Sequence, residues 1–381
     1  MLPAPLTDEA MADAAAEDDP TSLGAAERLR RRHGPETAAA ALDQLALRRR
    51  AVTKFGARAD HLFFTRDGLE QATRPAVAAY HADRLVATGC RRVVDLGCGI
   101  GSDAIAFADA GLEVVAVERD DRTAQIARAN IGDRGRVITG DAEELAAELI
   151  MPGDAVFLDP ARRSSAGRLW RTEDFRPSWP FVTAMLSRAD PTAVKLGPAL
   201  PHRDIPAGVE AEWLTDRGET VEVCLWSGNG STPEARVAMI MPEHRLVAAD
   251  RMVATRPVGR YLYEPDGAVI RAGAIGVLAE CLSAGLLDPQ IAYLTGDEPV
   301  LTPYATGFEI TEVLPYSDKL LRRWVRDRRI GRLEIKKRGV DIDPAALRRQ
   351  LKPSGPGSAT MIISRTPAGA RVLIGTRIRS G

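Results

Sequence analysis

Four acidic residues stand where short apolar runs of the sequence end. Asp95 closes the run R-V-V-D, and Glu118 closes V-V-A-V-E. Asp141 and Asp159 follow two later runs, at 136–139 and 155–158. Parallel strands present their carboxyl ends at one edge of a sheet, so we expect the four carboxylates to gather there. An acidic residue about 20 positions after a glycine turn also suits the two hydroxyls of a ribose.

Three glycines follow Asp95 directly in the sequence L-G-C-G-I-G. They are Gly97, Gly99 and Gly101, and an alanine-rich helical stretch begins at Ser102. A strand, a glycine turn and a helix in this order bring main-chain N–H groups close to a ligand that a Cβ would keep away. The glycines alone also fit a dinucleotide-binding dehydrogenase. Four acidic strand ends exceed what a dehydrogenase needs.

Residues 93–162 therefore resemble, motif by motif, a class I S-adenosylmethionine (SAM)-dependent methyltransferase. The resemblance implies that Asp95 lies near the methionine amine of SAM and that the three glycines pass beneath the nucleoside. It implies that Glu118 binds the ribose hydroxyls. It also assigns the adenine edge to Asp141 together with the backbone of Ala142.

The segment upstream of the first strand commonly folds over the methionine end of SAM in this family. Here it reads L-F-F-T and then G-L-E-Q-A-T. Phe64, Gln71 and Thr73 are the candidates for this roof. Phe64 could equally be an ordinary core residue.

The four residues D-P-A-R, from Asp159 to Arg162, stand where amino-methylating nucleic-acid enzymes have Asn/Asp-Pro-Pro-aromatic. In those enzymes the acidic or amide side chain accepts a hydrogen bond from an exocyclic amine of the base. The resemblance makes Asp159 a catalytic residue, although a plain strand-end carboxylate is the alternative. Ala161 replaces the second proline, and Arg162 replaces the aromatic. A guanidinium can stack on a base or bind a phosphate, and both roles stay open for Arg162.

A second group of relatives, the RNA 5-methyluridine methyltransferases, has D-P-P-R and a nucleophilic cysteine after the fifth strand. This chain has G-P-A at 197–199, so methylation through a cysteine adduct is disfavoured. SAM carries an already activated methyl group, and no metal is required.

Composition limits the other classes of function. A chain of 381 residues suggests two or three domains, and its net charge of −1 gives no overall attraction to nucleic acid. The four cysteines are scattered, which favours a reducing cytoplasm and disfavours a zinc site. We expect no signal peptide and no membrane span, because the first residues are acidic and no apolar run is long enough.

The alternating pattern of strands and helices predicts an α/β fold of class I methyltransferase (Rossmann-like) type. We expect a helical region over 1–85 and a methyltransferase domain with a seven-stranded sheet over 86–245. The runs 219–226 and 235–240 are predicted to be the antiparallel pair that ends this sheet. The helical region could cap the sheet or recruit substrate.

Residues 255–381 begin a new pattern and predict a separate α/β domain, with a helix over 271–286. The sequences Y-L-Y-E-P-D-G-A-V-I-R-A-G, A-Y-L-T-G-D and E-I-K-K-R-G-V-D resemble the THUMP-like domain that follows a methyltransferase core in a bacterial family. True THUMP domains deliver RNA to modification enzymes. The resemblance therefore suggests RNA as a partner.

The segment 319–352 is strongly basic, although the chain as a whole has a net charge of only −1. It has 13 basic and 4 acidic residues, a net charge of +9, and it contains Trp324. A basic surface with an aromatic side chain is typical of phosphate-backbone binding, although exposed charged helices are often only solvated. The basic residues are Lys319, Arg322, Arg323, Arg326, Arg328, Arg329, Arg332, Lys336, Lys337, Arg338, Arg348, Arg349 and Lys352.

These features together predict a cytoplasmic, SAM-dependent methyltransferase that acts on a base in RNA, either tRNA or rRNA. Two alternatives remain from the sequence. One is a methyltransferase of small molecules, which a second domain without a basic face would favour. The other is a module that binds SAM or nucleic acid without turnover, because the D-P-A-R motif departs from the usual pattern.

Overall fold

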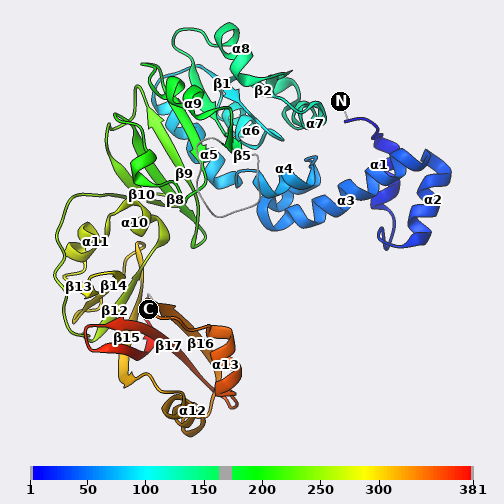
Figure 1. Cartoon of the computed structure of the whole chain (residues 1–381). Coiled ribbons are helices and arrows are strands. Elements are labelled where there is room, and N and C mark those ends of the chain that lie inside the picture. Colours follow the sequence, from blue (N-terminus) through cyan, green and yellow to red (C-terminus); the bar gives the residue numbers. More distant parts are fainter. Residues whose placement is uncertain (1–2, 163–173, 379–381) are drawn as a thin grey trace. The chain divides into compact units, whose positions relative to one another are not determined.

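The computed structural model describes residues 3–162 and 174–378 (Figure 1). The chain forms two compact units. The first unit consists of Met1–Ala211 and Glu222–Ala235, and the second unit of Glu212–Val221 and Arg236–Gly381. The chain therefore enters the second unit briefly, returns to the first unit, and then enters the second unit again.

The first unit begins with helices, as the sequence predicted. Thr7 and Ser22 cap the first two helices, because each hydroxyl accepts a hydrogen bond from a backbone amide three residues later. Pro35 opens the third helix, where its missing N–H costs no hydrogen bond. The helices are α1 (Asp8–Ala15), α2 (Leu23–His33), α3 (Pro35–Phe55), α4 (Arg66–Gln71) and α5 (Pro75–Ala87), with a 3₁₀ turn, η1 (Gly56–Asp60), after α3.

The centre of the first unit is a run of five parallel strands in the order β7-β4-β1-β2-β3. Strands β1, β4 and β7 are almost wholly buried, as expected of parallel strands covered on both faces. The strands are β1 (Arg92–Leu96), β2 (Glu113–Glu118), β3 (Gly135–Thr139), β4 (Ala155–Leu158) and β7 (Thr192–Leu196). The helices among them are α6 (Ser102–Asp109), α7 (Asp121–Ile131), α8 (Ala142–Leu149) and α9 (Trp179–Leu186).

The sheet has nine strands, in the order β11-β10-β8-β9-β7-β4-β1-β2-β3, rather than the seven that the sequence predicted. The predicted pairing of 219–226 with 235–240 is wrong, because β8 lies between β9 and β10. The additional strands are β8 (Glu210–Asp216), β9 (Glu219–Ser227), β10 (Arg236–Ile240) and β11 (His244–Val247).

Strand β8 escaped the sequence analysis because it carries charged residues on a buried strand. All of its residues are buried, and Glu210 is 0% exposed. Glu210 receives hydrogen bonds from Arg84 at 3.1 Å and from the Thr232 amide at 2.7 Å. Such partners offset the cost of burying a carboxylate.

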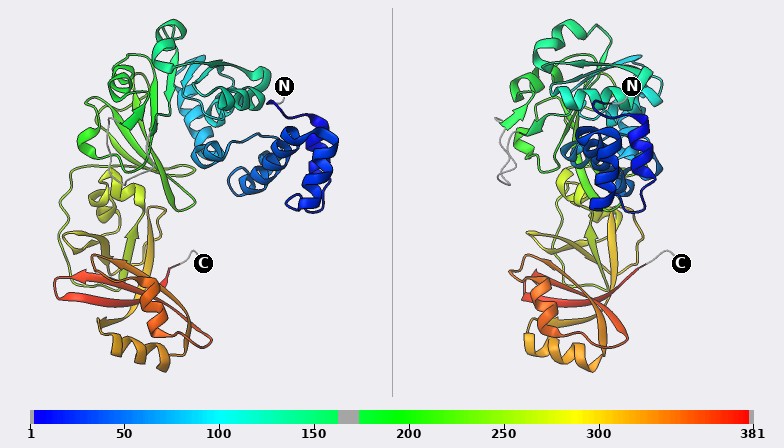
Figure 2. Two further views of the ribbon diagram at one scale, coloured as in Figure 1. Left: turned by 45° about the vertical axis from the view of Figure 1, so that its right-hand side comes forward. Right: turned by 90° about the vertical axis from the view of Figure 1, so that its right-hand side faces the viewer.

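The second unit has a seven-stranded sheet in the order β13-β14-β12-β15-β18-β17-β16, antiparallel except for β16 and β17. Its strands are β12 (Tyr261–Pro265), β13 (Gly285–Asp288), β14 (Ile291–Gly296), β15 (Ala305–Pro315), β16 (Ile330–Arg338), β17 (Gly357–Thr366) and β18 (Gly369–Arg377). Helices α12 (Asp318–Asp327) and α13 (Pro344–Leu351) pack together on one face of it (Figure 2).

The long helix predicted over 271–286 is wrong. The structure has α10 (Gly267–Ala272), α11 (Ile275–Cys281) and then strand β13. Gly273 ends α10 in a left-handed conformation with φ of 74°, which a glycine adopts without strain. Among the described residues, no helix is both long and apolar enough to cross a lipid bilayer.

Candidate functional site

The glycine turn after β1 depends on conformations that favour glycine. Gly97, Gly99 and Gly101 have φ values of 106°, 55° and 89°. A Cβ on Gly97 would lie 3.5 Å from the main-chain oxygen of Asp159, so the turn passes close to the end of β4. The two motifs that the sequence singled out, the glycines and D-P-A-R, therefore meet at one edge of the sheet.

Asp95 is a buried acidic residue at the end of β1, next to the glycine turn. It is 1% exposed, and within the described part of the chain neither carboxylate oxygen has a hydrogen-bond partner. Burial raises the pKa of Asp95 well above its usual range, and the neighbouring Asp103 and Asp159 raise it further. An unpaired buried carboxylate is costly, so a ligand that brings a cationic or N–H group fits this position.

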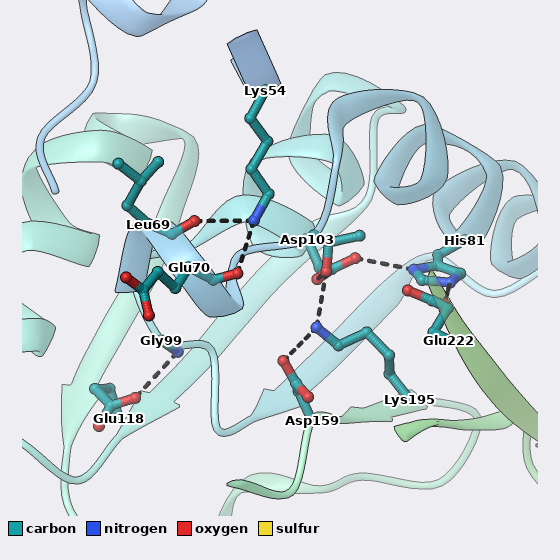
Figure 3. A network of polar contacts seen from close by, with 11 residues as sticks. Lys54, Leu69, Glu70, His81, Gly99, Asp103, Glu118, Asp159, Lys195 and Glu222 are labelled. Carbon is teal, nitrogen blue, oxygen red and sulfur yellow. Dashed lines mark hydrogen bonds and ion pairs between the residues drawn. The ribbon is translucent and has the colours of Figure 1, made fainter. Parts of the chain in front are cut away.

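Glu118, at the end of β2, contacts the glycine turn directly. One oxygen accepts a hydrogen bond from the amide of Gly99 at 3.0 Å (Figure 3). The other accepts from the amide of Asp120 at 2.8 Å. Asp141 caps α8 by accepting a hydrogen bond from the Glu143 amide at 2.9 Å. Ala142 is the first residue of that helix.

Asp159 is paired with a residue that the sequence analysis missed. The ammonium of Lys195 in β7 lies 2.5 Å from Oδ2 of Asp159 (Figure 3). Strands β4 and β7 are parallel neighbours, with Leu158 opposite Val194, which brings the two side chains together. The Lys195 side chain is 9% exposed and that of Asp159 is 34% exposed. A lysine inside the apolar run T-A-V-K-L was the available signal, since a buried charge needs a partner.

Lys195 continues into a row of buried polar groups (Figure 3). Its ammonium donates to the Thr73 hydroxyl at 3.0 Å, and that hydroxyl donates to Asp103 at 2.5 Å. His81 then bridges Asp103, at 2.9 Å, and Glu222, at 2.7 Å. The row connects β7, α6, α5 and β9.

Neighbouring charges in this row stabilise one another in their ionised forms. Burial would lower the pKa of His81, but the carboxylates of Glu222 and Asp103 raise it to about 10. Burial alone would raise the pKa of Asp103, but its contacts with His81 hold it below the ordinary value. His81 is therefore an imidazolium at neutral pH, and both of its ring nitrogens donate.

Lys54, at the end of α3, lies near the same edge. Its ammonium donates to the main-chain oxygens of Leu69, at 2.9 Å, and Glu70, at 3.1 Å. Burial lowers its pKa to about 8, and the positive charges of Lys195 and Arg74 contribute. These bonds attach α4 to α3 at its carboxyl end, where cations are favourable.

The three predicted roof residues have different positions. Thr73 lies in the polar row, whereas Gln71 is exposed at the end of α4. Phe64 is buried, which fits the alternative of an ordinary core residue, and its role in the roof stays a prediction. Its ring is 1% exposed and packs against Phe55, with ring centroids 5.4 Å apart, because Gln44 holds its backbone inside the core.

Arg162 is described only through its backbone. It pairs with Phe175 in a two-stranded ribbon formed by β5 (Ala161–Arg162) and β6 (Phe175–Arg176). Its side chain lies outside the described part of the chain. In that described part, no group of three or more His, Cys, Asp or Glu residues could hold a metal ion.

The basic segment lies on α12, β16 and α13 of the second unit. Some of its cations are already paired: Arg323 and Arg326 with Asp327, and Arg328 with Glu312. Trp324 is half-buried and donates to Glu312 at 3.1 Å. Among the residues that the structure describes, the exposed cations of the segment without an ion pair are Lys319, Arg322, Arg329, Arg332, Lys337, Arg348, Arg349 and Lys352.

Three parts of the chain match known families. Residues 94–156 match a family described as "Methyltransferase domain", and residues 305–377 match one described as "THUMP domain-like". Residues 8–51, which include α1, α2 and most of α3, match a domain of unknown function.

The relatives found are methyltransferases by name. An uncharacterized S-adenosylmethionine-dependent methyltransferase of Mycobacterium tuberculosis, recorded in strains CDC 1551 and H37Rv, is 34% identical over 339 residues. That alignment covers 85% of this chain and 92% of the relative. A crystal structure from Porphyromonas gingivalis W83, assigned as a methyltransferase, is 24% identical with a TM-score of 0.75. It covers 91% of this chain and 92% of its own, and it confirms the α/β fold predicted from the sequence.

Proposed function

The chain belongs to the SAM-dependent methyltransferases, and from that membership we propose that it methylates a base in RNA, either tRNA or rRNA. The observation that carries the choice of RNA is the group of exposed, unpaired cations on the THUMP-like region. Cations that no carboxylate neutralises are available to phosphates, whose charge dominates the affinity for nucleic acid.

The residues at the sheet edge fit SAM, which supplies a methyl group activated on a sulfonium. We assign the buried carboxylate of Asp95 to the methionine amine, since it has no partner among the described residues. Glu118 takes the ribose hydroxyls, and Asp141 with the Ala142 backbone takes the adenine edge. Phe64, Gln71 and Thr73 stay the candidates for the roof.

Asp159 is proposed as the catalytic residue that faces the acceptor. One oxygen is held by Lys195, and the 34% exposure of the side chain leaves the other able to accept a hydrogen bond from an amine. Arg162 would hold the base or a neighbouring phosphate. We propose neither a metal nor a cysteine adduct, since an activated methyl needs only a positioned acceptor.

A small-molecule acceptor is the second candidate, and one cavity favours it. The cavity measures about 330 Å³, which suits a small ligand, and it reaches Thr73 at the edge of the site. Apolar side chains form much of its wall, and Arg58, Asp109 and Arg134 line its polar part. We expect the protein to act in the cytoplasm, because its four cysteines are free.

The test is mass spectrometry of nucleosides from tRNA and rRNA of a deletion strain and its parent. We expect one methylated nucleoside to be missing in the deletion strain and to return with the wild-type gene but not with Asp159→Ala. Unmodified RNA from the deletion strain, incubated with purified protein and labelled SAM, should accept the label. Identical nucleoside profiles would favour the small-molecule acceptor.

A further inference from the structure

Lys195 is unusual because it lies within a buried strand, one residue before the strand's carboxyl end. Its neighbours in β7 are apolar, and β4 and β9 flank the strand on either side. A buried ammonium is stable only when acceptors replace the water that it has lost. The structure gives it two, Oδ2 of Asp159 at 2.5 Å and the Thr73 hydroxyl at 3.0 Å.

Behind Lys195, charges of opposite sign alternate through the first unit. The order is Asp159, Lys195, Asp103, His81 and Glu222, with the Thr73 hydroxyl between Lys195 and Asp103. The side chains from Lys195 to Glu222 are at most 9% exposed, whereas Asp159 is 34% exposed. Asp159 is thus the end of the row that can meet a substrate.

We propose that Lys195 is a positioning residue, which fixes Asp159 through Oδ2 so that Oδ1 is directed at the acceptor. This inference rests on the proposed role of Asp159 in methyl transfer. The groups behind Lys195 hold its ammonium in place, because Thr73 accepts from it and Asp103 orients Thr73. No residue of this row other than Asp159 needs to touch the methyl acceptor.

The charges around Asp159 support this role. Among the described residues, the acidic groups that act on this cluster include Asp103, Glu222 and Asp95, and the cations include Lys195, Lys54, Arg74 and His81. Burial raises the pKa of Asp159, and Lys195 opposes that rise. Without Lys195 the pKa would rise further, and Asp159 would accept hydrogen bonds only at higher pH.

The test compares two inhibitors in the full-length protein by titration calorimetry at pH 6 and pH 7.5. S-adenosylhomocysteine lacks the methyl group, whereas sinefungin carries an amine at that position. If Asp159 faces the methyl position, the wild type binds sinefungin more tightly at both pH values. Lys195→Met should bind S-adenosylhomocysteine with normal affinity. The ratio by which it favours sinefungin over S-adenosylhomocysteine should fall by about tenfold or more, and the fall should be largest at pH 6.

The matched control is Lys336→Met, which removes a lysine paired with Glu264 at 2.6 Å in the second unit. It should keep the wild-type preference. Lys195→Met should also lower kcat on the unmodified RNA without raising KM for SAM, and Lys195→Arg should restore part of the rate. If Lys195→Met fails to fold, Thr73→Val serves instead, with an expected loss of preference of about twofold to tenfold.

If Lys195→Met favours sinefungin over S-adenosylhomocysteine as strongly as the wild type does at both pH values, the inference is wrong. Absence of any preference in the wild type would also overturn it, since Asp159 would not face the methyl position. The protein could also favour sinefungin in a way that depends on Lys195 and yet methylate no RNA. That result would support the inference about Lys195 and would exclude only RNA as the substrate.

Discussion

The amide of Gly99 donates a hydrogen bond of 3.0 Å to Glu118, so the glycine turn after β1 is tied to the end of β2. The second oxygen of Glu118 accepts from the Asp120 amide at 2.8 Å. The carboxylate assigned to the ribose is therefore oriented by the loops on both sides of it. Preorganisation of this kind lowers the cost of binding.

Replacing Glu118 with glutamine should weaken binding of both SAM and S-adenosylhomocysteine. The loss of a charged hydrogen-bond acceptor costs about 1.5–3 kcal/mol, or about 10- to 150-fold in affinity. Titration calorimetry measures it. Glu113→Gln, on an exposed residue at the opposite end of β2, is the control and should bind normally. Equal affinities for wild type and Glu118→Gln would remove Glu118 from the cofactor site.

Asp159→Asn should retain the affinity for SAM and lose methyl transfer. The amide keeps the shape of the side chain but neither pairs as well with Lys195 nor accepts as strongly from an amine. Binding is followed by calorimetry, and transfer by label incorporated into RNA from the deletion strain. A parallel loss of binding and turnover would instead make Asp159 a cofactor or folding residue.

Removing unpaired cations of the basic segment should weaken the salt dependence of RNA binding. For single strands the slope of log K against log salt is about −0.7 for each phosphate contact. The test variant carries glutamine at four of these positions, Lys319, Arg322, Arg348 and Arg349. If each of the four cations contacts a phosphate, the slope of the variant should be less steep by up to about 2.8. Filter binding at several salt concentrations measures this.

The matched control for the basic segment changes four exposed arginines of the first unit, Arg30, Arg31, Arg49 and Arg136, to glutamine. The total charge falls equally, so a general electrostatic effect would flatten both slopes alike. SAM affinity should be unchanged in both variants. If the slope becomes less steep only in the control variant, the first unit and not the basic segment binds RNA.

His81 should stabilise the protein less as the pH rises. Its pKa in the folded state is about 10, above the ordinary 6.5, so its contribution is complete below about pH 6.5 and is lost as the pH rises through about 10. The free energy of unfolding should therefore differ most between wild type and His81→Gln at about pH 6.5 and below. We expect that difference to shrink as the pH rises from about 6.5 to about 10.

Denaturation at a series of pH values checks this prediction for His81. Comparing variants cancels the effect of other groups that titrate in the same range, such as Lys54 with its pKa of about 8. His61→Gln, at an exposed histidine, is the control and should track the wild type. A difference that stays constant from pH 6 to pH 10 would mean that His81 is not an imidazolium in the folded protein.

The cofactor edge could be predicted from the sequence because its signals are local. Gly97 and Asp95 stand two residues apart, and the run that ends at Glu118 is short and apolar. Parallel pairing then places such strand ends together without further information. The fold class followed from the same alternation.

The charged row could not be predicted, because its partners are distant in the sequence. Lys195 and Thr73 are 122 positions apart, and His81 and Glu222 are 141 apart. Each residue alone resembles an ordinary strand or helix residue. The strand β8 was missed for a related reason, since its glutamates read as exposed until Arg84 is known to lie beside Glu210.

The route of the chain through the two units limits how the protein can be divided. Residues Glu212–Val221 belong to the second unit but precede Glu222–Ala235, which belong to the first. Domains are usually joined by one flexible linker and can be separated there. Here no single break in the chain separates the two units cleanly, because each unit is built from two stretches of sequence. A truncated product that ends at Ala235 would therefore keep the whole first unit but would also carry Glu212–Val221 without the rest of the second unit.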